Sequence, residues 1–374
     1  MLWMTTLTWG SELASNERVV MLAATIFFAA GSAFIFTLFV SRVVKSHQQR
    51  REKRIKASFQ KKLNAIIINE TFSTKEVPDS AFEFRMAEIR NILGSSTFAR
   101  EILIDQILDL KKNLAGAAVH VLTASYFALS LQKQSLKKLR QFAWRNKALG
   151  IRELSEMHYQ EAIPQISKFI HSSNQTLQEE SVMALVRLNT EKSLQFLDYY
   201  TGHITPWMQI NIHNYLQKSD LRKLPQFHRW FTSKNESVVT FSINMAKQFR
   251  QSSAIPHLLS LCTHSRANIA ADAIETLGDL EAYEHRGVIV KLSPIYWNNP
   301  DITIKILQCL SKIGDFQLDT HIIKEFLNHP EYDVRFEAVK ALTKLGLPSA
   351  HILKHNSGQG IENILAHTTE PLLQ

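Results

Sequence analysis

The sequence predicts an all-α protein in which an N-terminal transmembrane helix precedes an α-solenoid of stacked helix pairs. Three observations predict this class. An apolar fraction of 45% supplies a continuous core, and only 12 Gly and 10 Pro in 374 residues argue against a many-stranded sandwich or barrel. An uncharged apolar segment lies near the N-terminus. Finally, one apolar helical pattern recurs from about residue 140 onward, which is typical of helical repeats.

These patterns divide the chain into consecutive segments of different character. The expected segments are a short extracytoplasmic N-terminus (1–18), a transmembrane helix (19–41), a basic juxtamembrane stalk (42–70), an N-terminal helical cap (71–139), a repeat solenoid (140–346), and a C-terminal cap and tail (347–374). The cap is expected because the end of a solenoid has to cover the first apolar face.

The apolar segment Val19–Ser41 contains no charged residue. Its 23 residues would form a helix of about 35 Å, enough to cross a hydrocarbon core of about 30 Å. A cleaved signal peptide is the alternative. We consider it the weaker one because Glu12 and Glu17 stand where a basic n-region would lie, and because the apolar run is too long for a signal peptide.

A basic block follows the span and accounts for most of the formal net charge of +9. Residues 42–62 contain nine Lys and Arg against the single acid Glu52. The positive-inside rule therefore predicts a single-pass protein of the inner (cytoplasmic) membrane, with its N-terminus outside and its solenoid in the cytoplasm. Anionic lipid heads are an expected second partner of this block, through Arg50, Arg51, Lys53 and Arg54. Nucleic acid is an unlikely partner, because lipid already explains the charge.

The repeat appears when helical blocks with apolar second and fifth positions are aligned. The blocks begin at Lys147, Ser181, Asn211, Ser242, Ala273, Ile306 and Ala338, at spacings of 34, 30, 31, 31, 33 and 32 residues. Pro164, Pro225 and Pro256 each precede a block start by 17 residues. Because proline is tolerated in the first turn of a helix, each unit is expected to consist of helix A, a turn and helix B.

The last full unit, Asn328–Gly346, identifies the kind of repeat. Its Asp333-Val334-Arg335 entering helix B and its Leu345-Gly346 resemble the HEAT-repeat signature, in particular the short HEAT repeats of the phycobiliprotein-lyase class. The resemblance covers about residues 140–346 and is poorest in the third unit, where Trp207 replaces the entering valine. It implies a curved stack of helix pairs whose B helices line a concave face that binds proteins.

Helices are also expected on both sides of the repeats. In the cap, one should begin near Ser96 and run over 98–114, after a loop at 70–80. At the C-terminus, a short pair over 350–354 and 361–367 should flank a turn at 358–360.

No catalytic, cofactor-binding or metal-binding pattern is recognised in the sequence. Phosphate-loop, nucleophile-elbow and Cys-x-x-Cys motifs are absent, and Cys262 and Cys309 are expected to be core residues. The histidine pairs, such as His257 with His264, lack the spacing of a helix-borne metal site. We therefore predict no cofactor, no metal and no enzymatic activity.

The seventh positions of the B helices are the candidate partner-facing residues. They are Glu153, Arg187, Gln217, Gln248, Asp279, Lys312 and Lys344. From these and their surroundings we select Arg187, Lys312, Lys340, Lys344 and Trp230 as candidate contacts, although tryptophans in solenoids more often pack in the core. The predicted function is a membrane-anchored scaffold that binds a protein partner. The alternative is a lyase-like protein that holds a small-molecule or chromophore ligand in the concave groove.

Overall fold

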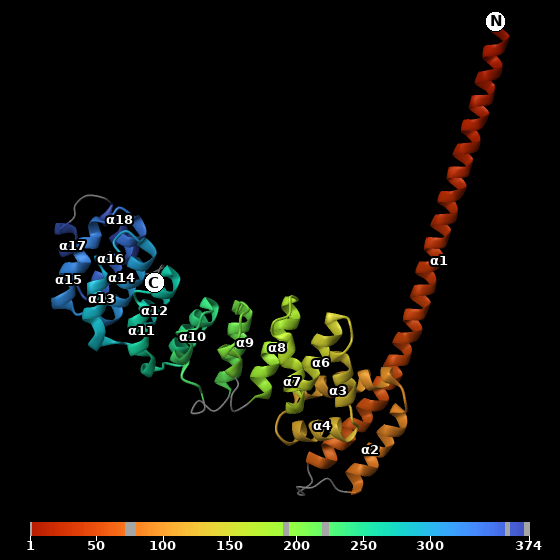
Figure 1. Ribbon diagram of the computed structural model, residues 1–374, viewed down its shortest axis with the longest axis horizontal. Coiled ribbons are helices and arrows are strands. Elements are labelled where there is room, and N and C mark those ends of the chain that lie inside the picture. Colours follow the sequence, from red (N-terminus) through yellow and green to blue (C-terminus); the bar gives the residue numbers. More distant parts are fainter. Residues whose placement is uncertain (1, 72–79, 190–193, 219–223, 356–359, 370–374) are drawn as a thin grey trace. The chain divides into compact units, whose positions relative to one another are not determined.

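The computed structural model describes residues 2–71, 80–189, 194–218, 224–355 and 360–369, and every regular element in these ranges is a helix (Figure 1). The predicted fold class, an all-α chain with one long apolar N-terminal helix followed by helical repeats, is confirmed. The chain divides into two compact units, Met1–Lys137 and Lys138–Gln374. The finer division into six segments remains a prediction.

The first unit begins with α1 (Leu2–Thr71), a single uninterrupted helix. Among the described side chains, it holds one stretch that is apolar and long enough to cross a bilayer, and none of that stretch is buried in protein. Phe27, Phe28 and Phe34 in this stretch are each more than 60% exposed. Side chains of that kind, placed outside any protein core, are what a lipid-facing helix carries.

The C-terminal part of α1 is built into the core of the first unit. Phe59, Leu63 and Ile66 lie at helical spacing on one face of α1 and are at most 1% exposed. They belong to a core shared with α2 (Ser80–Leu93), α3 (Thr97–Asn113) and α4 (Ala117–Ala128), all of which contact α1. The expected loop at 70–80 falls almost entirely on residues 72–79, outside the described part of the chain.

The start of α3 confirms the helix expected near Ser96. The Ser96 side chain accepts a hydrogen bond from the backbone N–H of Ala99, which satisfies one of the unpaired donors of the first turn. α3 is also pinned to α1, because the Gln106 amide donates to the Lys56 carbonyl at 2.7 Å.

The second unit begins within α5 (Gln132–Leu139) and contains a row of B helices in which the seven aligned blocks lie. They are α6 (Trp144–Glu156), α8 (Gln175–Leu188), α9 (Pro206–Gln217), α10 (Glu236–Gln248), α12 (Ala267–Asp279), α14 (Pro300–Ile313) and α16 (Tyr332–Lys344). Fifth positions such as Ile151, Leu277, Leu310 and Leu342 are fully buried. The apolar periodicity therefore identified the face on which the repeats pack.

Polar caps fix where four of these helices begin. Asn174, Thr205, Asn235 and Asn299 each accept a hydrogen bond from a backbone N–H in the first turn that follows. Asn235 also donates to the carbonyls of Tyr200 and Gly202 in the preceding repeat, at 3.0 and 2.8 Å. The cap therefore also ties two neighbouring repeats together.

The expectation of an α-helix at every helix A position is wrong for the third and fourth repeats. In the described residues these positions hold only single 3₁₀ turns, Gln195–Asp198 and Phe227–Trp230. Spacing does not explain this difference, because these repeats follow spacings of 30 and 31 residues, while the fifth repeat also follows a spacing of 31 residues and contains the α-helix Ile255–Leu261. Pro225 lies before its turn and not inside a helix, and a proline disfavours α conformation in the residue that precedes it.

The other repeats with a described A element contain an α-helix there. α7 (Ile163–Ile166) and α11 (Ile255–Leu261) contain Pro164 and Pro256 in their first turns, as predicted. α13 (Arg286–Leu292) and α15 (Phe316–Glu325) precede the last two B helices. The C-terminal pair is also confirmed, as α17 (Ser349–His355) and α18 (Ile361–Thr369), while the turn between them lies mostly on residues 356–359, which are not described.

Candidate partner-binding surface

Three of the seven seventh positions, Arg187, Asp279 and Lys312, form ion pairs with a neighbouring repeat. Arg187 Nη1 in α8 is 2.7 Å from Glu156 Oε1 in α6, and Lys312 in α14 pairs with Asp279 in α12. We call this row of residues and their pairing partners the B-helix ridge. Its charges are used inside the protein, where they link neighbouring repeats.

The centre of the B-helix ridge is a shared carboxylate. Glu275 accepts hydrogen bonds from Lys247, at 3.0 Å, and from Lys305, so that one residue links three successive B helices. Burial by itself would raise the pKa of Glu275, but the two lysines outweigh burial and the net pKa is lowered. Asp272, one turn earlier, has a raised pKa because burial and the neighbouring Glu275 outweigh the attraction of the lysines.

At the N-terminal end of the second unit, one ion pair is almost fully buried. Lys138 Nζ lies 2.6 Å from Glu153 Oε1, and their side chains are 9% and 3% exposed. A charge in such a place is tolerated only when it is paired. Glu153 is therefore a structural residue and not a contact for a partner.

The candidate contacts predicted from the sequence consequently differ in what they can offer. Arg187 and Lys312 are engaged within the B-helix ridge. Lys340 is exposed, and its nearest carboxylate is that of Glu337 on the same helix, at 3.9 Å. Lys344 is also exposed, with no ion pair among the described residues. Of the four cations predicted as contacts, Lys340 and Lys344 are therefore the more open to a partner.

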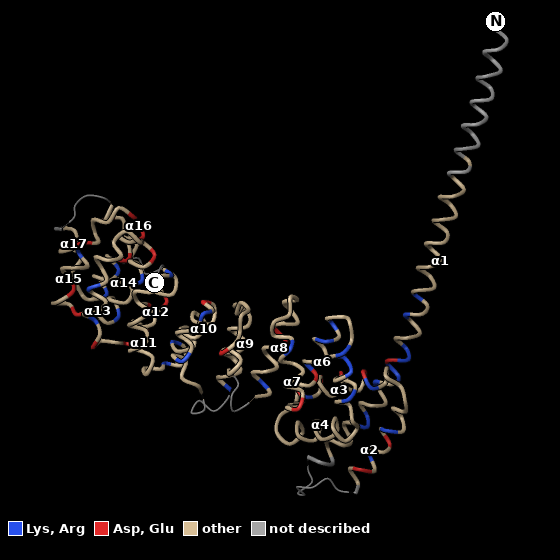
Figure 2. Tube along the Cα trace, viewed as in Figure 1, with Lys and Arg blue, Asp and Glu red and all other residues tan. Residues whose placement is uncertain are grey.

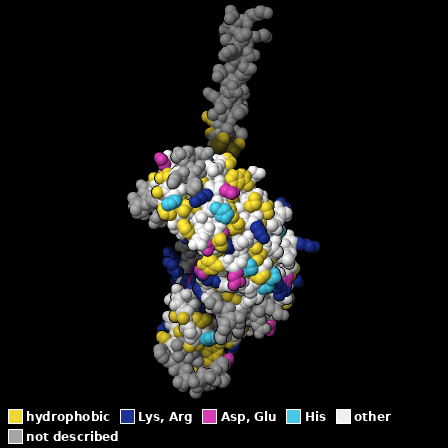
Figure 3. All heavy atoms as spheres, turned by 90° about the vertical axis from the view of Figure 1, so that its left-hand side faces the viewer, with side chains coloured by type: hydrophobic (Ala, Val, Ile, Leu, Met, Phe, Trp, Pro, Cys, Tyr) yellow, Lys and Arg dark blue, Asp and Glu magenta, His cyan; other side chains and the backbone are white. Residues whose placement is uncertain are grey.

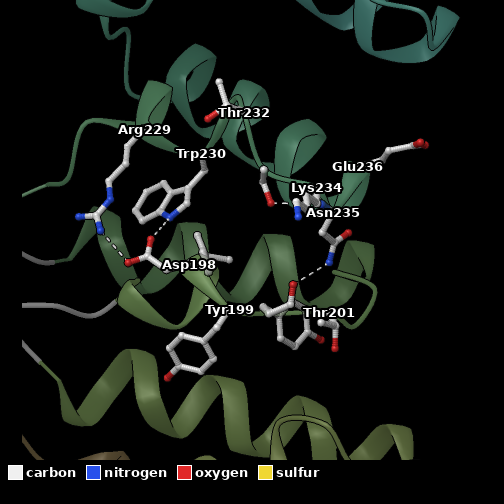
Figure 4. Close-up of a pocket in the computed structure, with 12 residues that line it drawn as sticks. Asp198, Tyr199, Thr201, Arg229, Trp230, Thr232, Lys234, Asn235 and Glu236 are labelled. Atoms are coloured by element: carbon white, nitrogen blue, oxygen red, sulfur yellow. Dashed lines mark hydrogen bonds and ion pairs between the residues drawn. The ribbon is translucent and has the colours of Figure 1, made fainter.

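Trp230 does not fit the role of a partner anchor. It is 4% exposed, and its indole N–H donates to Asp198 Oδ1 at 2.7 Å. Arg229 reaches the other oxygen of the same carboxylate at 2.6 Å, so both side chains converge on Asp198 (Figure 4). Trp230 is therefore unsuited as an anchor because its ring is buried at the contact between two repeats and its N–H is already bonded within the protein.

Next to this junction lies an open pocket of about 790 Å³ between the A–B turns of the third and fourth repeats. Its lining comes from residues 197–201 and 229–236 (Figure 4). Tyr199 is 53% exposed there, and Lys234 is exposed without an ion pair among the described residues. The lining mixes hydroxyls, an aromatic ring and a cation, which is chemistry suited to a peptide segment.

The remaining aromatic and basic candidates are mainly structural. Trp297 packs against Phe326, with ring centroids 5.0 Å apart. Arg335 donates through Nη1 to the carbonyls of His329 and Pro330, both at 2.7 Å, so it stabilises the segment that precedes α16. Trp144 and Trp207, by contrast, are 42% and 47% exposed. On the visible face of the C-terminal repeats, basic, acidic, apolar and histidine side chains are interspersed (Figure 3).

Most of the predicted lipid-facing cations of the stalk, unlike the paired cations of the B-helix ridge, are exposed and have no ion-pair partner among the described residues. Arg50, Lys53 and Arg54 are exposed, and no carboxylate among the described residues pairs with them. Along this part of α1, Lys and Arg predominate over Asp and Glu (Figure 2). Arg51 lies with its guanidinium 5.7 Å from the centre of the Phe98 ring, in the first unit. Further along α1, Lys62 pairs with Glu88 at 2.6 Å.

One basic region was missed by the sequence reasoning. Between Asp109 and Glu153 the chain contains no acidic residue, yet it carries nine Lys and Arg. Phe142 within it is fully exposed, at 103%. The stretch was overlooked because acidic residues elsewhere in the chain cancel its positive charge in the net charge. A search for segments that lack acidic residues would have found it.

The described part of the chain contains neither a reactive thiol nor a group of side chains placed to bind a metal ion. Burial raises the pKa of both the Cys262 and the Cys309 thiol to about 12, which keeps them protonated and unreactive. Among the described residues, no three His, Cys, Asp or Glu side chains are grouped to hold a metal ion.

Comparison with known proteins relates this chain to helical-repeat folds. No protein-family model matches the chain, and no curated protein does. The solved structures that it resembles include a designed armadillo repeat protein, with 13% identity over 57% of this chain and 99% of its own and a TM-score of 0.31. Importin beta has 10% identity over 85% of this chain and 47% of its own, with a TM-score of 0.38.

A third neighbour is the phycocyanin lyase complex from Nostoc, with 13% identity over 71% of this chain and 93% of its own and a TM-score of 0.25. The neighbours are thus armadillo- and HEAT-type repeat proteins, the class that the signature in Asn328–Gly346 predicts. At these levels of similarity they carry no inference about function.

Proposed function

We propose that this protein is a non-enzymatic membrane-anchored scaffold whose solenoid binds a protein partner in the cytoplasm. The observation that carries the proposal is the continuity of α1. One helix contains both the apolar stretch, which no protein buries, and the residues Phe59, Leu63 and Ile66, which form the core of the first unit. The anchor is therefore part of the folded domain and not a flexible tether.

The orientation follows from the stalk. Arg42 and Lys45 come directly after the apolar stretch, Arg50, Arg51, Lys53 and Arg54 lie nine to thirteen residues beyond Ser41, and residues 42–51 contain no acid. Such a block is retained on the cytoplasmic side and attracts anionic lipid heads, each cation contributing about 1 kcal/mol. Since the described part of the protein supplies these cations with no carboxylate partners, lipid phosphates are their natural counterions.

The partner surface is proposed at the C-terminal end of the B-helix ridge and at the open pocket. Lys340 and Lys344 project from α16 without a strong partner in the described chain, whereas Arg187 and Lys312 are engaged. An acidic protein surface complements the two free lysines. The pocket beside Tyr199 and Lys234 offers room for a peptide segment of the same partner.

Anchoring is tested by fractionation of the full chain and of a variant that lacks residues 1–41. The full chain should stay in the membrane pellet after alkaline carbonate extraction, and the variant should become soluble. Protease added to intact cells or inside-out vesicles should digest the solenoid only from the cytoplasmic side. A full chain that is extracted by carbonate would contradict the proposal.

Partner binding is tested by a photo-crosslinking amino acid at position 344 of the full chain in native membranes. A discrete protein adduct is expected there. The matched control is position 301, because Asp301 is also an exposed residue of a B helix but lies at its beginning instead of its end. The lyase-like alternative predicts a different result, namely a small-molecule mass on the detergent-extracted protein in native mass spectrometry and no protein adduct.

A further inference from the structure

The first repeat exposes aromatic, aliphatic and basic side chains that lie close together in the sequence. They are Arg140, Phe142, Trp144, Arg145 and Leu149, which we call the Phe142 patch. Phe142 is 103% exposed, and Trp144 and Leu149 are 42% and 41% exposed. All five belong to the second unit, in the segment that joins α5 to α6 and in the first turns of α6. A fully solvated phenylalanine at a loop tip contributes nothing to the core of the protein.

The cations of the Phe142 patch are available, unlike most of those nearby. In the stretch between Asp109 and Glu153, Lys112, Lys138 and Arg152 are held by carboxylates. Arg140 and Arg145, however, have no ion pair among the described residues. The Arg145 guanidinium lies 5.8 Å from the centre of the Trp144 ring, so that charge and aromatic surface are presented together.

This combination matches the interface of an anionic bilayer. Aromatic side chains insert at the level of the headgroups, and adjacent Lys and Arg contact lipid phosphates. An apolar tip that stands clear of the protein can enter a fluid interface, where no partner pocket of matching shape is needed. The absence of acids over residues 110–152 removes the repulsion that such a surface would otherwise meet.

The anchor makes this contact effectively intramolecular. Because the solenoid and α1 belong to one chain, a weak second contact with the same bilayer gains from the effective concentration that the anchor provides. We propose that the Phe142 patch is a second membrane-docking site, which lays the first repeat of the solenoid against anionic lipid. This proposal rests on the membrane anchoring proposed above.

The test uses the full chain in nanodiscs with an environment-sensitive fluorophore on Ala143→Cys. Ala143 is exposed between Phe142 and Trp144, and its side chain makes no cap hydrogen bond, so both aromatic residues are kept. The two native thiols, Cys262 and Cys309, are buried and have pKa values of about 12, so only the introduced cysteine is labelled. Nitroxide-labelled lipids should quench the fluorophore in nanodiscs with anionic lipid and much less in zwitterionic ones.

The matched control is the same label on Ala267→Cys. Ala267 is exposed in the first turn of α12, in a later repeat. No Phe, Tyr or Trp lies within five residues of it, and its basic neighbour Arg266 is paired with Glu236 at 2.7 Å. Its quenching should not depend on lipid charge. Quenching that is equal at both positions would show that the solenoid meets the bilayer without using the Phe142 patch, and would overturn the proposal.

Two variants test the chemistry of the contact. Arg140→Gln with Arg145→Gln should lower the ratio of docked to undocked protein about 25-fold, at about fivefold per cation near an anionic surface. Phe142→Ser should lower it about tenfold through the lost apolar insertion. The matched charge control, Lys340→Gln with Lys344→Gln, removes two exposed cations from the other end of the repeats and should leave docking unchanged.

The outcomes separate this proposal from the one on which it rests. If the chain does not enter nanodiscs, the anchoring proposal fails. If it enters them but the label at position 143 remains unquenched at every lipid composition, anchoring stands and the docking site is wrong. If position 143 is unquenched but forms a specific crosslink to an acidic protein in native membranes, the patch binds protein and the lipid assignment is overturned.

Discussion

The stalk and the B-helix ridge are both rich in Lys and Arg, but their cations serve different purposes. In the stalk, Arg50, Lys53 and Arg54 have no carboxylate partner among the described residues. In the ridge, Lys247, Lys305 and Lys312 are all paired with acids of neighbouring helices. The difference shows that the charge of a segment says little about binding until its partners in the fold are known.

The sequence spacing of the ion pairs explains why the cations of the B-helix ridge find partners within the protein. Arg187 and Glu156 are 31 residues apart in sequence, and Lys312 and Asp279 are 33 apart, which is one repeat in each case. A repeat therefore brings an acid of one helix beside a base of the next. The stalk helix has no neighbour of this kind along residues 42–50, so its cations face solvent or lipid.

The largest effect on stability should come from the buried pair. Glu153→Gln leaves Lys138 charged and unpaired at 9% side-chain exposure, which should cost about 3–5 kcal/mol. Amide hydrogen exchange of α6 in the detergent-solubilised full chain measures this as a local opening free energy, which suits a repeat protein without a single unfolding transition. Lys138→Met combined with Glu153→Leu should recover most of the loss; a double variant as unstable as the single one would contradict this account.

A smaller effect is expected at the centre of the B-helix ridge. Glu275→Gln removes two partly exposed ion pairs, and after solvent screening the cost should be about 1 kcal/mol at pH 7. Because the folded-state pKa of Glu275 is lowered, its contribution is present above its ordinary pKa of 4.5 and is lost as the pH falls through the folded value. Hydrogen exchange of α12 should therefore show wild type and variant converging in acid, and a constant gap would argue against the pairing.

Asp272→Asn should act in the opposite direction and more weakly. The pKa of Asp272 is raised by burial and by Glu275, so its ionised form destabilises the fold at neutral pH. The variant should be more stable than wild type by less than 1 kcal/mol at pH 7. This gain should disappear as the pH falls through the raised folded pKa toward the ordinary 3.8, where the wild-type carboxyl also becomes neutral. Equal stability at pH 7 would show that the site is effectively solvated.

The stalk should give the smallest change in stability. Arg50→Gln, Lys53→Gln and Arg54→Gln together should alter the opening free energy of α3 by less than 0.5 kcal/mol, because no folded-state partner is lost. The same triple variant should bind anionic lipid less tightly, which vesicle flotation of detergent-free reconstituted protein would measure. A clear destabilisation would mean that these cations are structural, and the contrast with the ridge would fail.

The fold was largely predictable because its signals are local and periodic. The seven blocks, the Ser96 cap and the apolar stretch of α1 are patterns that one sequence displays. The 3₁₀ turns found among the described residues at the helix A positions of the third and fourth repeats were not predicted, because a register taken from prolines and block starts does not report whether the chain between two B helices forms an α-helix.

The candidate site was less predictable because it depends on contacts across repeats. The positions of Arg187 and Lys312 were selected correctly as a row, but their partners become visible only when acids one repeat away are considered. Trp230 was overestimated because a 3₁₀ turn, not a helix, places its ring against Asp198. The Phe142 patch was overlooked because a segment without acids does not stand out in a net charge.

In the proposed membrane arrangement, the continuity of α1 would also fix the direction in which the first unit faces around the helix axis. Between Ser41 and Phe59 the helix covers about 27 Å, and each residue turns it by about 100°. A residue inserted in the exposed part of the stalk would therefore swing the first unit around the axis of the anchor as well as lift it by about 1.5 Å. An insertion of seven residues would nearly restore the original rotation of the first unit about the helix axis and would lengthen the stalk by about 10 Å. Insertions or deletions of about two helical turns would therefore change the length of the stalk while nearly preserving the orientation of the first unit about the helix axis.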